Sequence, residues 1–279
     1  MIEKRADGVS VEAMCDVLEV SASGYYASRN RPSCKRHQAN MQLGEDVERV
    51  FVESRLTYGS DRVHQKLRQQ GIRTSRKRVA RLMQERGFRS ARARKRRTGL
   101  TRPGDHAYIV ENLLQQDFSA THTNEKWVTD TTYIPTHEGW LYLVSVMDLY
   151  SRQVVGWAIG KQHNAELATD ALDMAIQRKH PAPGLIVHSD RGSEFANARF
   201  HKHALTAKIK LSMSSTGNCY DNAAAESFFA TVKLEAVRDQ VFASHLQAKH
   251  ILFDYIEVFY NRQRLHSGIQ FQCPASLAA

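Results

Sequence analysis

From residue 125 onward, short apolar runs alternate with turn residues and helical patterns, and this order constrains the fold more than any other feature. Runs rich in apolar and β-branched residues cover 126–132, 141–147 and 153–159, with Glu138-Gly139 and Ser151-Arg152 between them. Such a pattern predicts three antiparallel strands joined by short turns. A helix over 165–178, a strand over 185–188, a helix over 196–207 and a short strand over 209–213 are expected next. The order indicates an α/β domain with a mixed five-stranded sheet.

Two further helices are expected after the sheet, over residues 221–237 and 243–260. Asp221 can cap the first helix, since its side chain can accept from a free backbone N–H of the first turn. The second helix carries apolar residues on more than one face. It is therefore expected to pack on the core or on a second subunit.

The chain before residue 98 has the pattern of two groups of helices. Residues 9–27 read as a helix-turn-helix with Ser10 and Ser21 as caps, although a hairpin that binds nothing remains an equal alternative. Helices are also expected over 40–56, from a cap at Ser60, and over 76–86 after Thr74-Ser75. The last of these resembles a DNA recognition helix, with four basic residues that mostly face outward: Arg76, Lys77, Arg78 and Arg81.

The net charge of +10 is concentrated in the first part of the chain. Residues 1–117 hold 24 Lys and Arg against 14 Asp and Glu, whereas residues 118–279 hold 15 of each. Residues 73–97 alone hold 12 basic groups and one acid, and residues 92–97 are expected to form a basic arm. This density favours a polyphosphate partner such as DNA, and a solvated basic face is the alternative.

Several classes of protein do not fit this sequence. No apolar run approaches the 18 residues that a membrane span needs, and the first residues lack the apolar core of a signal peptide. The four cysteines are scattered, without a Cys-x-x-Cys pair. A cytoplasmic, nucleoid-associated protein with reduced thiols and no cysteine-based zinc site is expected.

Three acidic residues fall where a catalytic centre can form. Asp130 lies in the first strand, Asp190 ends the fourth, and Glu226 lies on the helix over 221–237. Open α/β sheets usually build their sites at the carboxyl ends of strands. Carboxylates that converge there can hold two divalent ions about 3.5–4 Å apart, which clamp the attacking and leaving oxygens of a phosphodiester displacement. The three acids together predict metal-dependent chemistry on nucleic acid.

Other polar residues near these acids have simpler readings. Turn and cap roles suffice for Asp148 and Asp221. His188 is equally compatible with a metal neighbour and with a hydrogen-bonded core histidine. Lys233 shares a helical face with Glu226, where it can meet a phosphate or form an exposed ion pair of little energetic value.

The sequence blocks around the three acids resemble those of bacterial insertion-sequence transposases. The matching blocks are Thr129-Asp130-Thr131-Thr132-Tyr133-Ile134, His188-Ser189-Asp190-Arg191-Gly192-Ser193-Glu194-Phe195 and the segment 218–229, with Lys233 as the basic residue downstream. The upstream segment 58–64 and the tail Tyr260-Asn261-Arg262-Gln263-Arg264-Leu265-His266-Ser267, followed by Pro274, are also similar. The resemblance runs from about Val9 to Pro274. It is strongest to the second-reading-frame product of two-frame elements, in the wider retroviral-integrase group.

The resemblance implies a ribonuclease-H-like catalytic core in which Asp130, Asp190 and Glu226 bind two Mg²⁺ or Mn²⁺ ions. It implies DNA strand cleavage that leaves a 3′-hydroxyl, then strand transfer by that hydroxyl, without a covalent protein–DNA intermediate. Four residues would position the DNA strand near the metals: Asn218, Tyr220, Asn222 and Lys233. The four basic residues of 76–81 would hold duplex DNA, mainly through phosphates.

The expected partners are the terminal repeats of the element, target DNA and further copies of the chain in a dimer or higher assembly. An upstream first-frame protein is a further candidate, because it often supplies end recognition in such elements. The expected domains are 1–35 (helix-turn-helix), 36–97 (basic helices), 98–123 (linker), 124–240 (catalytic core) and 241–279 (C-terminal helix and tail). Two alternatives remain open: a metal-dependent nuclease without strand transfer, and a non-catalytic DNA-binding regulator.

Overall fold

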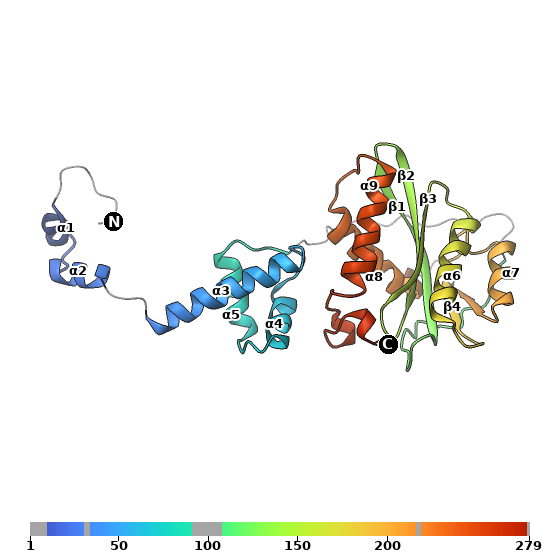
Figure 1. The fold of residues 1–279 in the computed structure, drawn as a ribbon, viewed down its shortest axis with the longest axis horizontal. Helices are drawn as coiled ribbons and strands as arrows, with labels where there is room; N and C mark the ends of the chain where they lie inside the picture. The colour runs from blue at the N-terminus through green and yellow to red at the C-terminus, as the bar shows by residue number, and fades with distance from the viewer. Residues whose placement is uncertain (1–9, 31–33, 91–107, 216–218, 278–279) are drawn as a thin grey trace.

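A five-stranded mixed sheet lies between helices in the C-terminal part of the chain, and the N-terminal helices lie to one side of it (Figure 1). The computed structural model describes residues 10–30, 34–90, 108–215 and 219–277; the expected basic arm over 92–97 lies outside them. The strands are β1 (Lys126–Thr136), β2 (Gly139–Asp148), β3 (Val154–Gly160), β4 (Ile186–Ser189) and β5 (Lys210–Met213). Their order is β3-β2-β1-β4-β5, with β1, β2 and β3 antiparallel and β1, β4 and β5 parallel. This topology confirms the ribonuclease-H-like core.

Helices cover both faces of the sheet (Figure 1). On one face lie α8 (Ala223–Val232) and α9 (His245–Phe253), and on the other lie α6 (Ala165–Lys179) and α7 (Ala198–Thr206). Successive side chains of a strand point to opposite faces, so β1 contributes to two apolar clusters. Val128 and Ile134 are buried in the cluster that contains residues of α8 and α9, whereas Trp127 is buried in the cluster of α6 and α7.

Strand β1 continues to Thr136, four residues beyond the expected end at Thr132. The longer strand runs through Pro135, and proline cannot donate to a ladder. In the structure, the carbonyl of Pro135 accepts from the amide of Phe242, on the side of β1 away from β2. The proline nitrogen faces that same side, which β4 does not reach, because its last pair with β1 is Val128↔His188. No β-ladder hydrogen bond is therefore lost.

The N-terminal helices follow the predicted order, with small changes at their ends. They are α1 (Val11–Val17), α2 (Ala22–Asn30), α3 (Lys35–Glu53), α4 (Ser60–Gln69) and α5 (Arg76–Glu85). The hydroxyls of Ser10, Ser21 and Ser75 accept from backbone amides three residues ahead, as expected of caps. Ser60 is the first helical residue rather than the cap, which is Gly59. Helix α3 starts at Lys35, five residues before the expected start. Apolar spacing did not reveal this first turn, because its residues are polar and exposed.

Helices α8 and α9 each continue into a π-helical segment, and short 3₁₀ turns lie before α8 and at the end of the chain. A 3₁₀ turn, η1 (Cys219–Asn222), precedes α8, and the π-helical segment η2 (Lys233–Val237) follows it. Helix α9 likewise continues as the π-helical segment η3 (Asp254–Tyr260), and the 3₁₀ turns η4 (Ser267–Ile269) and η5 (Pro274–Leu277) close the chain. The expected cap at Asp221 is wrong. Its buried carboxylate accepts from the side chains of Asn112 and Gln116 and from the amide of Ser215, so it anchors the segment before β1.

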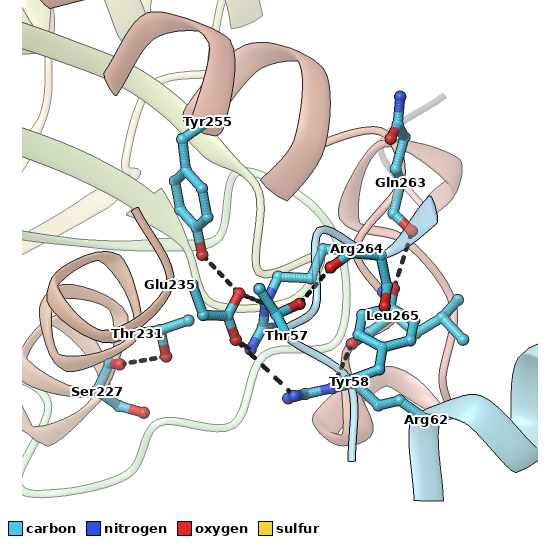
Figure 2. A network of polar contacts seen from close by, with 11 residues as sticks. Thr57, Tyr58, Arg62, Ser227, Thr231, Glu235, Tyr255, Gln263, Arg264 and Leu265 are labelled. Carbon is cyan, nitrogen blue, oxygen red and sulfur yellow. Dashed lines mark hydrogen bonds and ion pairs between the residues drawn. The ribbon is translucent and has the colours of Figure 1, made fainter. Parts of the chain in front are cut away.

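Helices α3 to α5 form a helical unit (residues 35–85) that contacts the core beside α9 and η3. Arg55 is paired with Asp254 and lies 4.8 Å from the ring centre of Phe259. Gln69 donates to the carbonyl of Phe271 at 3.0 Å. A buried polar network around Glu235 joins the same parts (Figure 2). Among the described residues, no helix combines the length and apolar character needed to cross a membrane.

Candidate active site

Asp130 on β1 and Asp190, directly after β4, lie at the same level of two neighbouring parallel strands. The pairs Lys126↔Ile186 and Val128↔His188 fix the register of β1 and β4. Each aspartate lies two residues beyond the last pair, at the carboxyl end of the ladder. Because neighbouring strands are about 4.8 Å apart, this register brings the two acidic residues close together. Backbone amides orient both carboxylates: Thr131 N donates to Asp130 at 2.7 Å, and Gly192 N donates to Asp190 at 2.9 Å.

Helix α8 brings Glu226 to the same end of β1. The helix starts against the strand, where Asn222 Nδ2 donates to the carbonyl of Thr129 at 3.4 Å. Ala225, Phe228, Phe229 and Val232 are buried and hold α8 on the sheet, whereas Glu226 in its first turn is exposed. Glu226 therefore faces the space beside Asp130 from one turn along the helix.

Glu226 lies close enough to Asp130 and Asp190 for its charge to act on the pKa of each. Burial, and then the charges of Asp190 and Glu226, raise the pKa of Asp130 well above its ordinary value. Burial, followed by the charges of Glu194 and Glu226, raises the pKa of Asp190 to about 6, although the Gly192 amide opposes this. Partial burial also raises the pKa of Glu226. Neighbouring like charges disfavour ionisation of one another, and a bound cation would offset this effect.

These side chains offer the oxygen ligands that Mg²⁺ and Mn²⁺ prefer. Asp130 and Asp190 are held in place, and their raised pKa values reflect the electrostatic demand that a cation would meet. Within residues 10–30, 34–90, 108–215 and 219–277, no three His, Cys, Asp or Glu side chains are placed to hold a metal ion as they stand. The donor set therefore fits a divalent ion if the exposed Glu226 side chain moves inward.

Neighbouring polar residues have structural partners. His188 is fully buried on β4, and its ring nitrogens lie 2.8 Å from Ser212 Oγ and 3.2 Å from Ser214 Oγ. Burial lowers its pKa to about 4, so it is a neutral core histidine. Asp148 is also buried and accepts from Ser151 and from the amide of Asn124. This arrangement agrees with a turn role for Asp148.

The basic residues of α5 lie on the helical unit. Arg76 and Arg81 are exposed and pair with Asp61 and Glu85, at 2.7 and 3.4 Å. Lys77 is exposed, whereas Arg78 is half-buried and donates to Asn40. Lys77, Arg78 and Arg81 line a surface hollow with Arg36 and Ala39 of α3. Four cations around one hollow form a strongly positive surface.

The other expected DNA contacts differ in what the structure shows of them. Lys233 Nζ lies 4.5 Å from the ring centre of Tyr133, an exposed residue of β1 that also contacts Trp140 edge to face. Asn222 is buried by its contact with β1. Asn218 lies outside the described residues, and Tyr220 lies in η1 with its side chain outside the description.

Comparison with known proteins identifies the family. A model described as an integrase core domain matches residues 120–219, a second integrase core model matches 207–274, and an HTH-like domain model matches 38–96. The transposase InsF for insertion sequence IS3A of Escherichia coli (strain K12) is 39% identical over 268 residues, which cover 95% of this chain and 93% of that protein. This chain belongs to the IS3 family of insertion-sequence transposases.

A second relative has a similar degree of identity to this chain. The uncharacterized 31 kDa protein of insertion element IS600 from Shigella sonnei is 39% identical over 263 residues, covering 94% of this chain and 96% of that protein. Among solved structures, the simian T-cell lymphotropic virus intasome in complex with PP2A regulatory subunit B56 gamma has a TM-score of 0.48 at 13% identity. That match covers 77% of this chain and 70% of the viral chain.

Glu194 and His163 adjoin the acidic centre of this IS3-family chain, and sequence reasoning did not single them out. Glu194 Oε1 accepts from Thr131 Oγ1 at 2.8 Å and lies 2.6 Å from His163 Nε2. Burial would raise the pKa of Glu194, but the hydrogen bonds from His163 and Thr131 lower it overall. Glu194 thus braces β1, beside Asp130, against the loop that holds Asp190. Its place four residues after Asp190 was the one available signal, whereas nothing in the sequence marked His163.

Gly192 allows this close arrangement. A Cβ atom at residue 192 would lie 2.5 Å from Glu194 Oε2 and 3.0 Å from Asp190 Oδ1. A side chain at residue 192 would therefore displace the carboxylate of Glu194 and crowd that of Asp190. Glu194 is buried, and its Oε2 atom has no hydrogen-bond partner among the residues that the structure describes.

Proposed function

We propose that this chain is a transposase that cleaves and joins DNA strands at a centre formed by Asp130, Asp190 and Glu226. The observation that carries the proposal is the shared level of Asp130 and Asp190 at one end of the β1–β4 ladder, with Glu226 close enough for its charge to raise the pKa of both. Membership of the IS3 family supports DNA transposition as the biological reaction. The division into strand cleavage and strand transfer is the part that needs a biochemical test.

The acidic centre is proposed to hold two Mg²⁺ or Mn²⁺ ions. Bound divalent metal would supply Lewis-acid activation of the attacking hydroxyl and stabilise charge on the leaving oxygen. Asp130 and Asp190 would provide the fixed oxygen ligands, and Glu226 would complete the set from α8. Glu194 would keep the loop of Asp190 aligned with β1.

The other expected contacts are proposed to hold DNA. Arg76, Lys77, Arg78 and Arg81 would bind phosphates of duplex DNA, which gives affinity without reading the base sequence. Lys233 lies seven residues after Glu226, on the same face of the helix, and would contact a phosphate close to the reacting DNA strand. Asn218, Tyr220 and Asn222 would position that strand at the start of α8.

The proposed assembly contains at least two copies of the chain, because both ends of an element must be handled together. An upstream first-frame protein is proposed as a further partner that would recognise the terminal repeats. The proposed domains are 1–35, 36–97 and 124–240, with a linker over 98–123 and a C-terminal helix and tail over 241–279.

A strand-joining assay tests the catalytic proposal. The protein would be incubated with labelled duplex carrying the element ends, with either intact or pre-cut 3′ ends, and a plasmid target in Mg²⁺. Nicking and joining by the wild-type protein, and neither by Glu226→Gln, are expected. Glu166→Gln is the matched control, because Glu166 is an exposed helical carboxylate on α6 paired with Arg199.

The assay also separates the two alternatives. A nuclease would nick intact ends but would not join the pre-cut 3′ end. A regulator would bind DNA without cutting, and its binding would survive Glu226→Gln. If a protein fused to the first-frame product also failed to cut or join, the transposase proposal would be wrong.

A further inference from the structure

A buried carboxylate, Glu235, lies at the junction of the helical unit and the helix that carries Glu226 (Figure 2). Glu235 belongs to η2, which continues directly from α8. Nine residues separate it from Glu226, or about 14 Å at the rise of an α-helix. The helix formed by α8 and η2 therefore has two different ends. Glu226 lies near the acidic centre at one end, and Glu235 lies at the contact with the helical unit at the other.

Within the core, two side chains hold Glu235 through three hydrogen bonds. Arg264 donates to both of its oxygens, with Nε to Oε2 and Nη2 to Oε1 each at 2.8 Å. Tyr255 of η3 donates to Oε2 at 2.9 Å. The side chains of Glu235 and Arg264 are each 4% exposed, so this two-point ion pair is almost fully removed from water.

Two residues of the helical unit close around this pair. The amide of Leu265 donates to Tyr58 Oη at 2.7 Å, and Tyr58 Oη donates to the carbonyl of Gln263 at 3.3 Å. Arg62 of α4 donates from Nε to the carbonyl of Leu265 at 3.0 Å, and its Nη1 lies 3.9 Å from Glu235 Oε1. The helical unit thus forms hydrogen bonds to the backbone on both sides of Arg264, and Arg62 also lies near the carboxylate of Glu235.

A buried ion pair is a poor way to gain stability, because apolar residues of similar volume often do as well or better. Its advantage is a fixed geometry, since a carboxylate and a guanidinium bonded at two points can adopt few relative orientations. Here that geometry fixes the end of the helix bearing Glu226 relative to α4. The start of the helix is fixed separately, by the hydrogen bond from Asn222 to the carbonyl of Thr129 on β1.

We propose that Tyr58 and Arg62 are positioning residues that act through Arg264 and Glu235 on helix α8, so that the placement of the helical unit on DNA sets the position of Glu226. This inference rests on the proposed function, because it gives Glu226 a catalytic role. In this inference, two residues of the helical unit contribute to strand joining, and this contribution is separate from any effect on DNA affinity. Neither Tyr58 nor Arg62 reaches the acidic centre itself.

The test compares Arg62→Ala with Arg68→Ala, Arg62→Lys and Tyr58→Phe in the full chain. Arg68 is exposed on the same helix and lies outside the network, so Arg68→Ala removes the same charge without touching it. DNA affinity, strand-joining rate with pre-cut ends, and hydrogen exchange of residues 223–237 with and without DNA would be measured. Pre-cut duplex that carries the element ends is the probe.

Arg62→Ala and Arg68→Ala are expected to bind DNA alike, while Arg62→Ala alone joins strands at least about tenfold more slowly. Tyr58→Phe is expected to lie between them, and Arg62→Lys to recover part of the rate. DNA should change the exchange of 223–237 in the wild type and in Arg68→Ala but not in Arg62→Ala. A purely structural role would instead raise exchange in 223–237 with and without DNA alike.

Two results would overturn the inference. One is strand joining by Arg62→Ala at the rate of Arg68→Ala, and the other is a DNA-induced exchange change in α8 that survives Arg62→Ala. Failure of the proposed function looks different, because joining would then be absent from the wild type or unaffected by Glu226→Gln. The exchange measurement tests the coupling even in that case.

Discussion

Tyr255 donates a hydrogen bond of 2.9 Å to Glu235, and this contact joins the two π-helical segments found in the described part of the chain. One segment extends the helix of Glu226 and the other extends α9. Insertions of π type in α-helices are rare and frequently occur at functional sites. In this protein Glu235, in one of these segments, contacts Tyr255 in the other, Arg264 and, from the helical unit, Arg62.

The Glu235–Arg264 pair gives a stability prediction. Arg264→Met should destabilise the fold by about 3–5 kcal/mol, because it leaves the carboxylate of Glu235 buried beside Tyr255 without its cation. Equilibrium unfolding in denaturant would measure the loss. Glu53→Gln is the control, since Glu53 is exposed and lies 3.8 Å from Arg49, a pair worth less than about 1 kcal/mol. Similar losses in the two variants would contradict the prediction.

The acidic centre predicts a pH-dependent response to metal. The folded protein raises the pKa of Asp190 from 3.8 to about 6, so it favours the protonated form. This contribution to the free energy of unfolding is present below about pH 4 and is lost as the pH rises through 6. Mg²⁺ should therefore raise the melting temperature more at pH 7.5 than at pH 5, when followed by thermal unfolding. An equal rise at both pH values, or an unchanged rise in Asp190→Asn, would argue against metal binding at Asp190.

The fold was largely predictable because strand ends follow from local pattern. Apolar runs ended by polar residues located the strands of Asp130 and Asp190, and helical spacing located α6 and α8. The misjudged elements depend on contacts between distant residues. Pro135 fits β1 because β4 stops short of it, and Asp221 binds Asn112 and Gln116 about a hundred residues earlier.

The same limit applies to the candidate site. The positions of Asp130 and Asp190 at strand ends were readable, as was the periodicity that placed Glu226 on a helix. The brace formed by Thr131, His163 and Glu194 was not, because three separate segments meet only once the sheet and α6 are packed. No sequence pattern predicts a contact between a histidine and a glutamate that are 31 residues apart.

This brace gives a third prediction. Glu194→Ala should slow strand joining at least about tenfold, because β1 and the loop of Asp190 lose their shared partner. Glu194→Gln should retain more activity, since its amide oxygen can still accept from Thr131. The control is Glu166→Ala, which removes an exposed carboxylate from nearby α6. Joining rates and the Mg²⁺ concentration at half-maximal rate would be measured. An unchanged Mg²⁺ requirement in Glu194→Ala would show that the brace does not align the acidic centre.

The hollow between α3 and α5 gives a prediction about salt dependence. Lys77 is exposed at its rim, so Lys77→Ala should weaken binding to any duplex and reduce the slope of log affinity against log salt by about one. Fluorescence anisotropy across a salt series, with element and unrelated duplexes, would measure both effects. Lys249→Ala on α9 removes the same charge from an exposed site away from the hollow and should leave the slope unchanged. A wild-type slope for Lys77→Ala would exclude a phosphate contact there, and a loss confined to the element sequence would indicate base recognition instead.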